Sequence, residues 1–275
     1  MRSAVVRVAS LALVVSALPV RADRLSGAGI QIVYQRPQQA ETHAIYRDLK
    51  ARRVLEGLRG IVRGVRLPHS LTLRLSVCGG EPNAWYAPET RTLTVCYEYV
   101  RDVADRASKI RSETGVTRRD AIFGPIAQVF LHELGHALYD LLDVPVLGRE
   151  EDAADQFAAL VLLELPPVQA RRAIDGIAYL FRSQAAEETL DQAVLADDHS
   201  LTAQRLYNLL CLAYGADRGT FGYLVAGSAL PKARAVQCGT EYDLAVYALQ
   251  KLFRYHLRDG RMGRARIRRA FRWMF

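Results

Sequence analysis

Two histidines stand four residues apart in the segment FLHELGHALYD, residues 130–140, where most of their neighbours are apolar. In an α-helix the side chains at positions i and i+4 lie on one face, so His132 and His136 present two imidazoles toward one point. Neutral imidazole is a preferred ligand of Zn²⁺. Glu133 lies one position round from His132, where it can reach a zinc-bound water without ligating the ion. The spacing therefore predicts a zinc site with its own general base.

A group of carboxylates follows about four helical turns later, in the segment GREEDAADQFA. A catalytic zinc ion takes three protein ligands and keeps one open position. Glu151 and Asp155 share one helical face, and Glu151 is predicted to complete the ligand set. Asp155 is predicted to accept a hydrogen bond from the far ring nitrogen of His132. Glu150 and Asp152 are assigned to the helix start, where acidic side chains are favoured. One zinc ion per chain is expected.

The elements that must position these side chains change character along the chain. Alternating apolar and polar residues predict strands over 29–35 and 71–78, and helical spacing predicts a helix over 41–62. The segments AWYA and TLTVCYEY flank PETR and predict a hairpin. The rest is mostly helical, with helices expected at 121–142, 150–165, 167–183, 201–214 and 242–257. A small early sheet followed by a helical bundle indicates the α+β class.

The first 22 residues have the pattern of a secretory signal. Arg2 and Arg7 precede the apolar run VASLALVVSALPV, and Val20-Arg21-Ala22 ends in a small residue. Cleavage is predicted after Ala22, which implies a periplasmic or secreted protein. The alternative is an uncleaved membrane anchor, for which the apolar run is short.

Net charge is unevenly distributed. The formal charge is +8, but residues 1–22 carry three arginines and residues 258–275 carry a net +6. Residues 23–257, the predicted catalytic domain, are left close to −1, which argues against a nucleic-acid-binding surface. The basic C-terminal tail, 258–275, could contact an anionic membrane or an acidic polymer, and a solvated amphipathic end helix fits equally well.

The four cysteines contain no Cys-x-x-Cys pair, which disfavours a zinc knuckle. An even number behind a secretory signal favours disulfides. Proximity in sequence predicts the bonds Cys78–Cys96 and Cys211–Cys238, although four cysteines allow three pairings.

The pattern HExxH followed by a helix that reads Glu-x-x-x-Asp resembles the gluzincin clan of zinc peptidases. The resemblance implies a zincin-like fold. In it, Glu151 is the third zinc ligand and Asp155 is hydrogen-bonded to a ligand without binding the ion itself. The segment NAWY is similar to the edge strand of those enzymes, whose backbone pairs with an extended substrate. Substrate contacts are therefore expected at Asn83, Ala84, Trp85 and Tyr86.

The segment HSLTAQR, residues 199–205, has the His-x5-Arg spacing of membrane-linked HExxH peptidases, with Ser200 where they usually have proline. The resemblance suggests that His199 and Arg205 lie near the substrate. The order of all these motifs, over about residues 29–257, is similar to a bacterial zinc-metallopeptidase family of unknown function.

The predicted function is an exported zinc peptidase that hydrolyses peptides or proteins. Glu133 would take the proton of a zinc-activated water and pass it to the leaving amine. His199 is the first candidate donor to the oxyanion, ahead of Tyr207, Tyr86 and Arg205, although His199 could equally be a helix-start residue. One alternative is a catalytically silent zinc module that binds a peptide or a cell-wall component through the edge strand. A structural helical protein with a fortuitous HELGH would bind no zinc.

Overall fold

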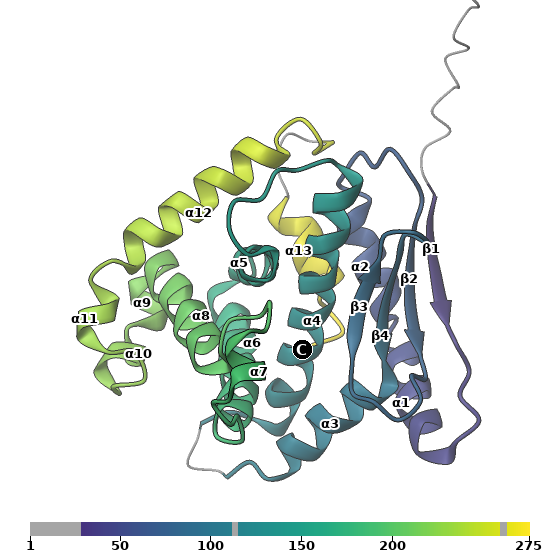
Figure 1. Ribbon diagram of the computed structural model, residues 1–275, viewed down its shortest axis with the longest axis horizontal. Helices are drawn as coiled ribbons and strands as arrows, with labels where there is room; N and C mark the ends of the chain where they lie inside the picture. The colour runs from purple at the N-terminus through teal and green to yellow at the C-terminus, as the bar shows by residue number, and fades with distance from the viewer. Residues whose placement is uncertain (1–28, 112–114, 259–262) are drawn as a thin grey trace, which may run out of the picture.

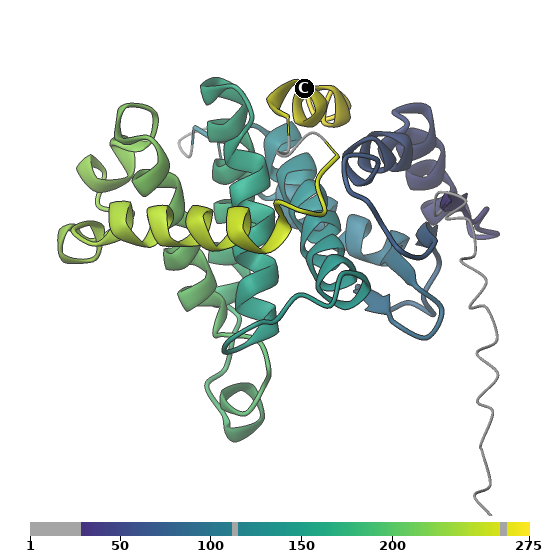
Figure 2. The ribbon, with the colours of Figure 1, turned by 90° about the horizontal axis from the view of Figure 1, so that it is seen from above.

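The computed structural model describes residues 29–111, 115–258 and 263–275. The predicted signal segment, residues 1–22, lies outside these ranges. A four-stranded sheet with two helices forms one side of the molecule, and the helices of the second half of the chain form the other (Figures 1 and 2). Among the described residues, no helix combines the length and apolar composition that a membrane crossing requires.

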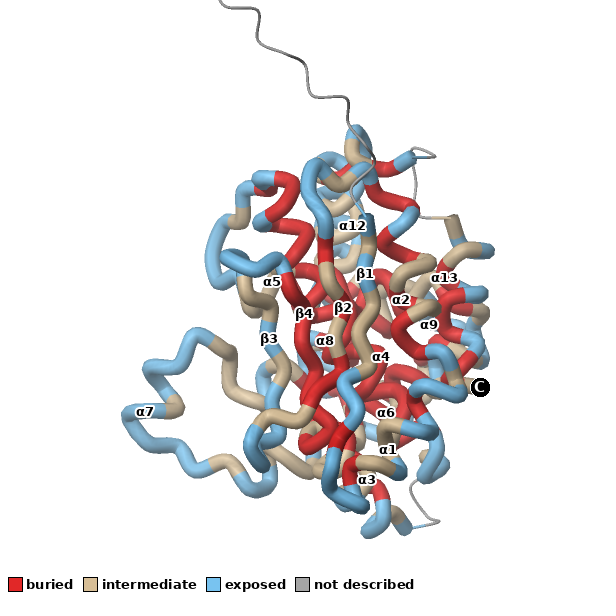
Figure 3. Tube along the Cα trace, turned by 90° about the vertical axis from the view of Figure 1, so that its right-hand side faces the viewer, coloured by how far each residue is buried: buried red, intermediate tan, exposed pale blue. Residues whose placement is uncertain are grey.

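The sheet is mixed and has the order β1-β2-β4-β3. Its strands are β1 (Ile30–Tyr34), β2 (Leu71–Ser76), β3 (Ala84–Ala87) and β4 (Thr92–Cys96). β1 and β4 run parallel to β2, whereas β3 pairs antiparallel with β4 and forms an edge of the sheet. β4 is buried along its whole length (Figure 3). The α+β class and the edge hairpin predicted from the sequence are confirmed.

Two predicted elements differ in kind from the elements of the structure, while other predicted elements are shifted by a few residues at their ends. The single helix expected over 41–62 is divided into α1 (Ala40–Ala51) and α2 (Val54–Val62) by Arg53, which has a left-handed backbone with φ of 58°. The strand expected to continue to Tyr99 ends at Cys96, and α3 (Tyr97–Ser108) begins. The physical reason is burial at helical spacing, because α3 buries Tyr97, Val100, Val103 and Ala107 on one side.

The central helix is α4 (Arg118–Leu141), which carries both histidines of the HELGH segment. It packs against α3, β3, β4, α5 (Glu150–Leu163) and α6 (Pro167–Ala185). The Thr117 side chain caps its first turn by accepting a hydrogen bond from the backbone N–H of Asp120. Burial by neighbours on several sides explains why α4 is apolar nearly all round.

The remaining helices continue the bundle. α8 (Thr202–Ala216) packs on α5, α6 and α12 (Cys238–Phe253). The shorter helices are α7 (Gln192–Leu195), α9 (Arg218–Phe221), α10 (Tyr223–Ala226), α11 (Lys232–Ala235) and α13 (Arg264–Ala270).

The C-terminal stretch packs back onto the domain that precedes it. α13 lies against α2, and the side chains of Ile267, Phe271, Trp273 and Met274 are buried in the main core. The sequence predicts residues 258–275 as a basic tail outside the domain. In the structure, their described apolar side chains belong to the same core as those of the domain.

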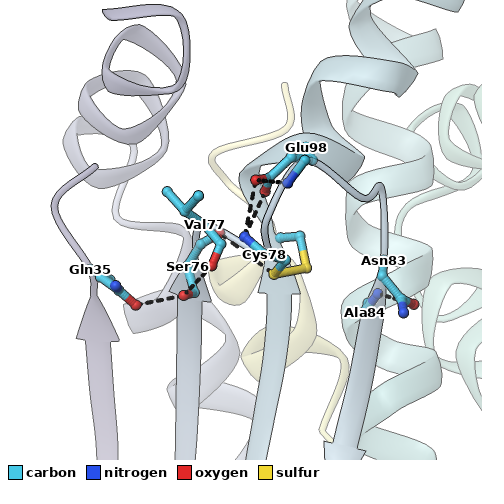
Figure 4. Close-up of a disulfide and its surroundings, with 9 residues drawn as sticks. Gln35, Ser76, Val77, Cys78, Asn83, Ala84 and Glu98 are labelled. Atoms are coloured by element: carbon cyan, nitrogen blue, oxygen red, sulfur yellow. Dashed lines mark hydrogen bonds between the residues drawn. A yellow bond between two sulfur atoms is a disulfide. The ribbon is translucent and has the colours of Figure 1, made fainter. Parts of the chain in front are cut away.

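Both predicted disulfides are present, Cys78–Cys96 and Cys211–Cys238. The first joins the segment after β2 to the last residue of β4 (Figure 4). The Glu98 carboxylate accepts the backbone N–H groups of Cys78, at 3.0 Å, and Gly80, at 3.1 Å. Together these bonds fix the segment that leads into β3.

Candidate metal centre

α4 and α5 approach each other closely at the glycine of the HELGH segment. A Cβ atom at Gly135 would lie 3.2 Å from the Cα atom of Ala154 and 3.3 Å from its Cβ atom. A larger side chain at position 135 would therefore move α5 outward. The contact sets Glu151 and Asp155 opposite the two histidines of α4.

Three candidate ligand groups converge at this crossing. The Nε2 atoms of His132 and His136 lie 3.2 Å apart. The Glu151 carboxylate lies 2.9 Å from His132 Nε2 and 3.4 Å from His136 Nε2. The two imidazoles come from one face of α4 and the carboxylate comes from the first turn of α5.

The separations match those that a tetrahedral zinc ion imposes on its ligands. Zinc–ligand bonds of about 2.0–2.1 Å in tetrahedral geometry place neighbouring ligand atoms about 3.3 Å apart. The observed range is 2.9–3.4 Å. These residues could therefore hold one zinc ion without a change in the helix crossing.

The far nitrogen of each imidazole has a carboxylate partner. His132 Nδ1 lies 2.9 Å from Asp155 Oδ1, and His136 Nδ1 lies 2.7 Å from Glu150 Oε1. Each carboxylate favours a proton on Nδ1, which leaves Nε2 with a lone pair. Two lone pairs and the Glu151 carboxylate then face one another. Such a set of acceptors requires a cation at its centre, either a metal ion or added protons.

The carboxylates around the imidazoles of His132 and His136 raise the pKa values of both rings. Burial lowers the pKa of His132, but hydrogen bonds with Asp155 and Glu151 outweigh it and raise the value to about 8. For His136, burial also lowers the pKa, and hydrogen bonds with Glu151 and Glu150 raise it to about 9. Against the effect of its own burial, the histidines hold the pKa of Glu151 well below its usual range. A site with this preference for positive charge favours a divalent cation.

Asp155 is held by side chains from two other helices, α8 and α4. Arg205, on α8, donates from Nε to Oδ2 at 2.7 Å and from Nη2 to Oδ1 at 2.9 Å. Gln128, on α4, donates to Oδ1 at 3.0 Å. Burial would raise the pKa of Asp155, but the hydrogen bonds from Arg205 and His132 keep it low. Asp155 therefore stays ionised and in a fixed orientation behind His132.

Glu133 is buried beside the candidate ligands and is only 7 % exposed. Burial raises the pKa of its carboxyl group, and the neighbouring His132 and His136 oppose that rise. Among the described residues, no hydrogen bond joins its carboxylate to the protein. The carboxylate is thus free to accept a proton from a molecule bound at the centre.

His199 lies next to the same cluster, although it is distant in sequence. Its Nε2 atom is 2.9 Å from Glu151 Oε2, and its ring stacks against that of His132 with centroids 6.1 Å apart. The hydrogen bond with Glu151 raises the pKa of His199. Its position is secured by Ser200, which donates to Asp152 at 2.7 Å, and by Arg149, which donates to the His199 carbonyl at 3.2 Å.

The residues of β3, together with Arg205 and Tyr207, were also expected near the substrate or its oxyanion, and each has its own set of contacts. The Tyr86 hydroxyl donates to Asp140 at 2.6 Å, and Trp85 beside it on β3 is 41 % exposed. Asn83 accepts the backbone N–H of Ala84 and precedes the strand. Arg205 binds Asp155 through one edge of its guanidinium, Nε and Nη2, and Tyr207 is exposed on α8.

Several contacts were not expected from the sequence. Glu150, assigned only to the helix start, lies against His136, and Asp152, assigned likewise, accepts from Ser200. Gln128 stands one turn before His132 on α4, a spacing that could have marked it as a partner of Asp155. Glu150 and Glu151 point in directions about 100° apart, so consecutive acids could reach different histidines.

Comparison with known proteins identifies one matching family. A family described as "Putative metallopeptidase" matches residues 34–253, which include α4, α5 and α8. No match was found among curated proteins or among solved structures. Since the matched range covers most of the 275 residues, the chain belongs to this metallopeptidase family.

Proposed function

We propose that the protein is an exported zinc peptidase that cleaves peptide bonds by general-base hydrolysis. The proposal depends on one observation. His132, His136 and Glu151 converge beside the buried carboxylate of Glu133, which makes no hydrogen bond to the described protein groups. A structural zinc site has four protein ligands, whereas three ligands and an adjacent base are typical of hydrolysis.

The chain would divide the reaction among these residues. His132, His136 and Glu151 would hold the zinc ion, which when bound supplies a Lewis acid and lowers the pKa of water toward ~7. Glu133 would accept a proton from the attacking water and deliver it to the leaving amine. Its raised pKa suits both roles, because a carboxyl group of raised pKa binds and releases a proton more readily near neutral pH.

His199 is the proposed donor to the oxyanion that forms on the scissile carbonyl. Its Nε2 atom borders the ligand cluster, and its raised pKa favours the charged imidazolium, which is the stronger donor. Arg205 is proposed as a positioning residue instead of a substrate contact, because its Nε and Nη2 groups both donate to Asp155.

The substrate would lie along β3. This strand is an edge of the sheet and lies beside α4, so an extended peptide could pair with its free backbone groups. The bond between Cys78 and Cys96 braces the hairpin that carries β3. Two disulfides in one chain fit an oxidising compartment, which supports export.

Proteome digestion tests the proposal directly. A denatured protein library is incubated with the wild type, with Glu133→Gln and with Glu89→Gln as an exposed control, each with and without a chelator. We expect new peptide termini only for the wild type and the control, and only without chelator. Cleavage that survives both Glu133→Gln and the chelator would overturn the mechanism. Zinc binding without any cleavage would favour the silent binding module.

A further inference from the structure

Three segments of the chain carry many basic residues and no acidic ones. Residues 57–70, 244–258 and 263–275 together contain eleven arginine and lysine residues and no aspartate or glutamate. We call the surface that they form the basic face. It includes α13 but extends well beyond the C-terminal stretch that the sequence alone marked as basic.

These segments meet in the folded protein. Val65 and Leu257 form an isolated antiparallel bridge, flanked by hydrogen bonds from Arg66 N to His256 O and from Arg258 N to Gly64 O. α13 packs on α2, and a Cβ atom at Gly64 would lie 3.2 Å from the Arg266 side chain. The positive charges of the three segments therefore add up in one region of the surface.

Most of these charges are not neutralised by the protein. Arg63, Arg268, Arg269 and Arg272 are exposed, and within the described part of the chain none of them forms an ion pair. Arg264, in contrast, pairs with Glu164 at 2.7 Å. A concentration of uncompensated guanidinium groups repels itself unless an anionic partner approaches it.

Aromatic side chains accompany the charges. Tyr255 is 71 % exposed, with the Arg254 guanidinium 4.3 Å from its ring centroid. Tyr247, on α12, is 59 % exposed, with the Lys251 ammonium 5.3 Å from its ring centroid. Exposed tyrosines next to basic side chains are typical of surfaces at a membrane interface, where the ring enters the headgroup layer and the cations meet phosphates.

We propose that the basic face docks the protein on a bilayer that contains anionic lipids. Guanidinium groups bind lipid phosphates with two hydrogen bonds each, and the tyrosines add apolar contacts that a soluble polyanion does not offer. α13 and α7 lie on opposite sides of the molecule (Figure 3), and α7 immediately precedes His199. A docked molecule would therefore keep the candidate metal centre open to the solution.

Vesicle sedimentation tests the docking. The full chain lacking residues 1–22 is mixed with vesicles of phosphatidylcholine alone or with 30 % phosphatidylglycerol, at low and high salt. We expect binding only to the anionic vesicles, with most of it lost at 0.5 M salt because exposed charges are then screened.

Matched variants locate the surface. Each exposed arginine near a bilayer contributes about a fivefold gain in affinity, so R63Q/R268Q/R269Q should weaken vesicle binding about a hundredfold. The control R36Q/R182Q/K232Q removes equal charge from outside the basic face and should leave binding nearly unchanged. Circular dichroism and melting temperature verify that both variants fold. Equal loss in the two variants, or no binding to anionic vesicles, would overturn the proposal. Binding to heparin or duplex DNA but not to vesicles would also overturn it.

Discussion

Arg205 of α8 holds Asp155 of α5 through two parallel hydrogen bonds, Nε to Oδ2 at 2.7 Å and Nη2 to Oδ1 at 2.9 Å. Asp155 in turn faces His132, so the pair connects a helix late in the chain to the candidate metal centre. A planar guanidinium fixes a carboxylate in orientation as well as in charge. The orientation of the His132 imidazole thus depends on a residue that is not itself a candidate ligand.

Arg205→Lys is expected to weaken zinc binding about tenfold or more, while the fold remains intact. Lysine keeps the positive charge but cannot hold both carboxylate oxygens, and loss of a group behind a ligand usually costs 10–100-fold in affinity. Competition with a chromophoric chelator measures the change. Arg234→Lys is the matched control, because Arg234 holds Glu241 in the same two-pronged way away from the metal centre. Equal zinc affinity in wild type and Arg205→Lys would refute the positioning role.

The zinc occupancies of Glu151→Gln and Glu150→Gln should show which glutamate is a zinc ligand and which one orients a ligand. Glu151→Gln removes a candidate ligand and should reduce zinc occupancy to near zero at micromolar zinc. The sequence alone predicts no effect at Glu150, but its contact with His136 now predicts a loss of about 10–100-fold. Metal analysis after gel filtration measures both. If Glu150→Gln lost more zinc than Glu151→Gln, the ligand assignment within α5 would be wrong.

His199→Ala should keep zinc at wild-type occupancy and lower kcat by ~10–10³, the usual effect of removing one oxyanion donor. Steady-state kinetics on a peptide that the wild type cleaves, with metal analysis of the same sample, provides the test. His43→Ala serves as a control histidine outside the site. Loss of zinc in His199→Ala would show that His199 is a zinc ligand. Full activity would show that His199 has no role in catalysis.

Gly135→Val should push α5 away from α4 and weaken zinc binding by more than tenfold. The added side chain would overlap Ala154, and overpacking of this kind costs about 1–3 kcal/mol of unfolding free energy. Gly60→Val on α2 is the matched control, since nothing lies within 4 Å of a Cβ atom there. Chemical denaturation and zinc competition measure the two effects. A Gly135→Val protein that binds zinc normally would show that the close crossing is not needed.

The stability of the metal-free protein should fall with rising pH over the same window in which the stabilising effect of zinc grows. The folded-state pKa values of His132 and His136, about 8 and 9, exceed the ordinary 6.5. Their contribution to stability is therefore complete below pH 6.5 and is lost as pH rises through 8 and 9. Zinc must displace these protons, so its stabilising effect grows over the same window.

The measurement is the melting temperature with zinc and with chelator between pH 6 and 9. The difference between the two curves should widen steadily, by up to ~1.4 kcal/mol per pH unit for each displaced proton. His132→Asn/His136→Asn, which cannot take up these protons, should flatten the chelator curve. A constant difference would mean that zinc does not compete with protons at the two imidazoles.

The sequence by itself determined the features that depend on local periodicity. Helical spacing placed His132 and His136 on one face with Glu133 beside them, and it placed Glu151 and Asp155 on one face of the next helix. Alternation and turn residues predicted the hairpin that makes β3 an edge strand, and cysteine spacing predicted both disulfides. Each of these follows from backbone geometry within one or two elements.

Only the tertiary structure decided which side chains meet across elements. Arg205 was expected near substrate and lies on Asp155, while Glu150 was expected to serve the helix start and lies on His136. The basic C-terminal stretch was expected to be a separate tail, yet Phe271 and Trp273 enter the core. Such partners depend on how closely two helices approach and at what angle they cross. Contacts such as that of Gly135 with Ala154 set both quantities, and no periodicity within either helix encodes them.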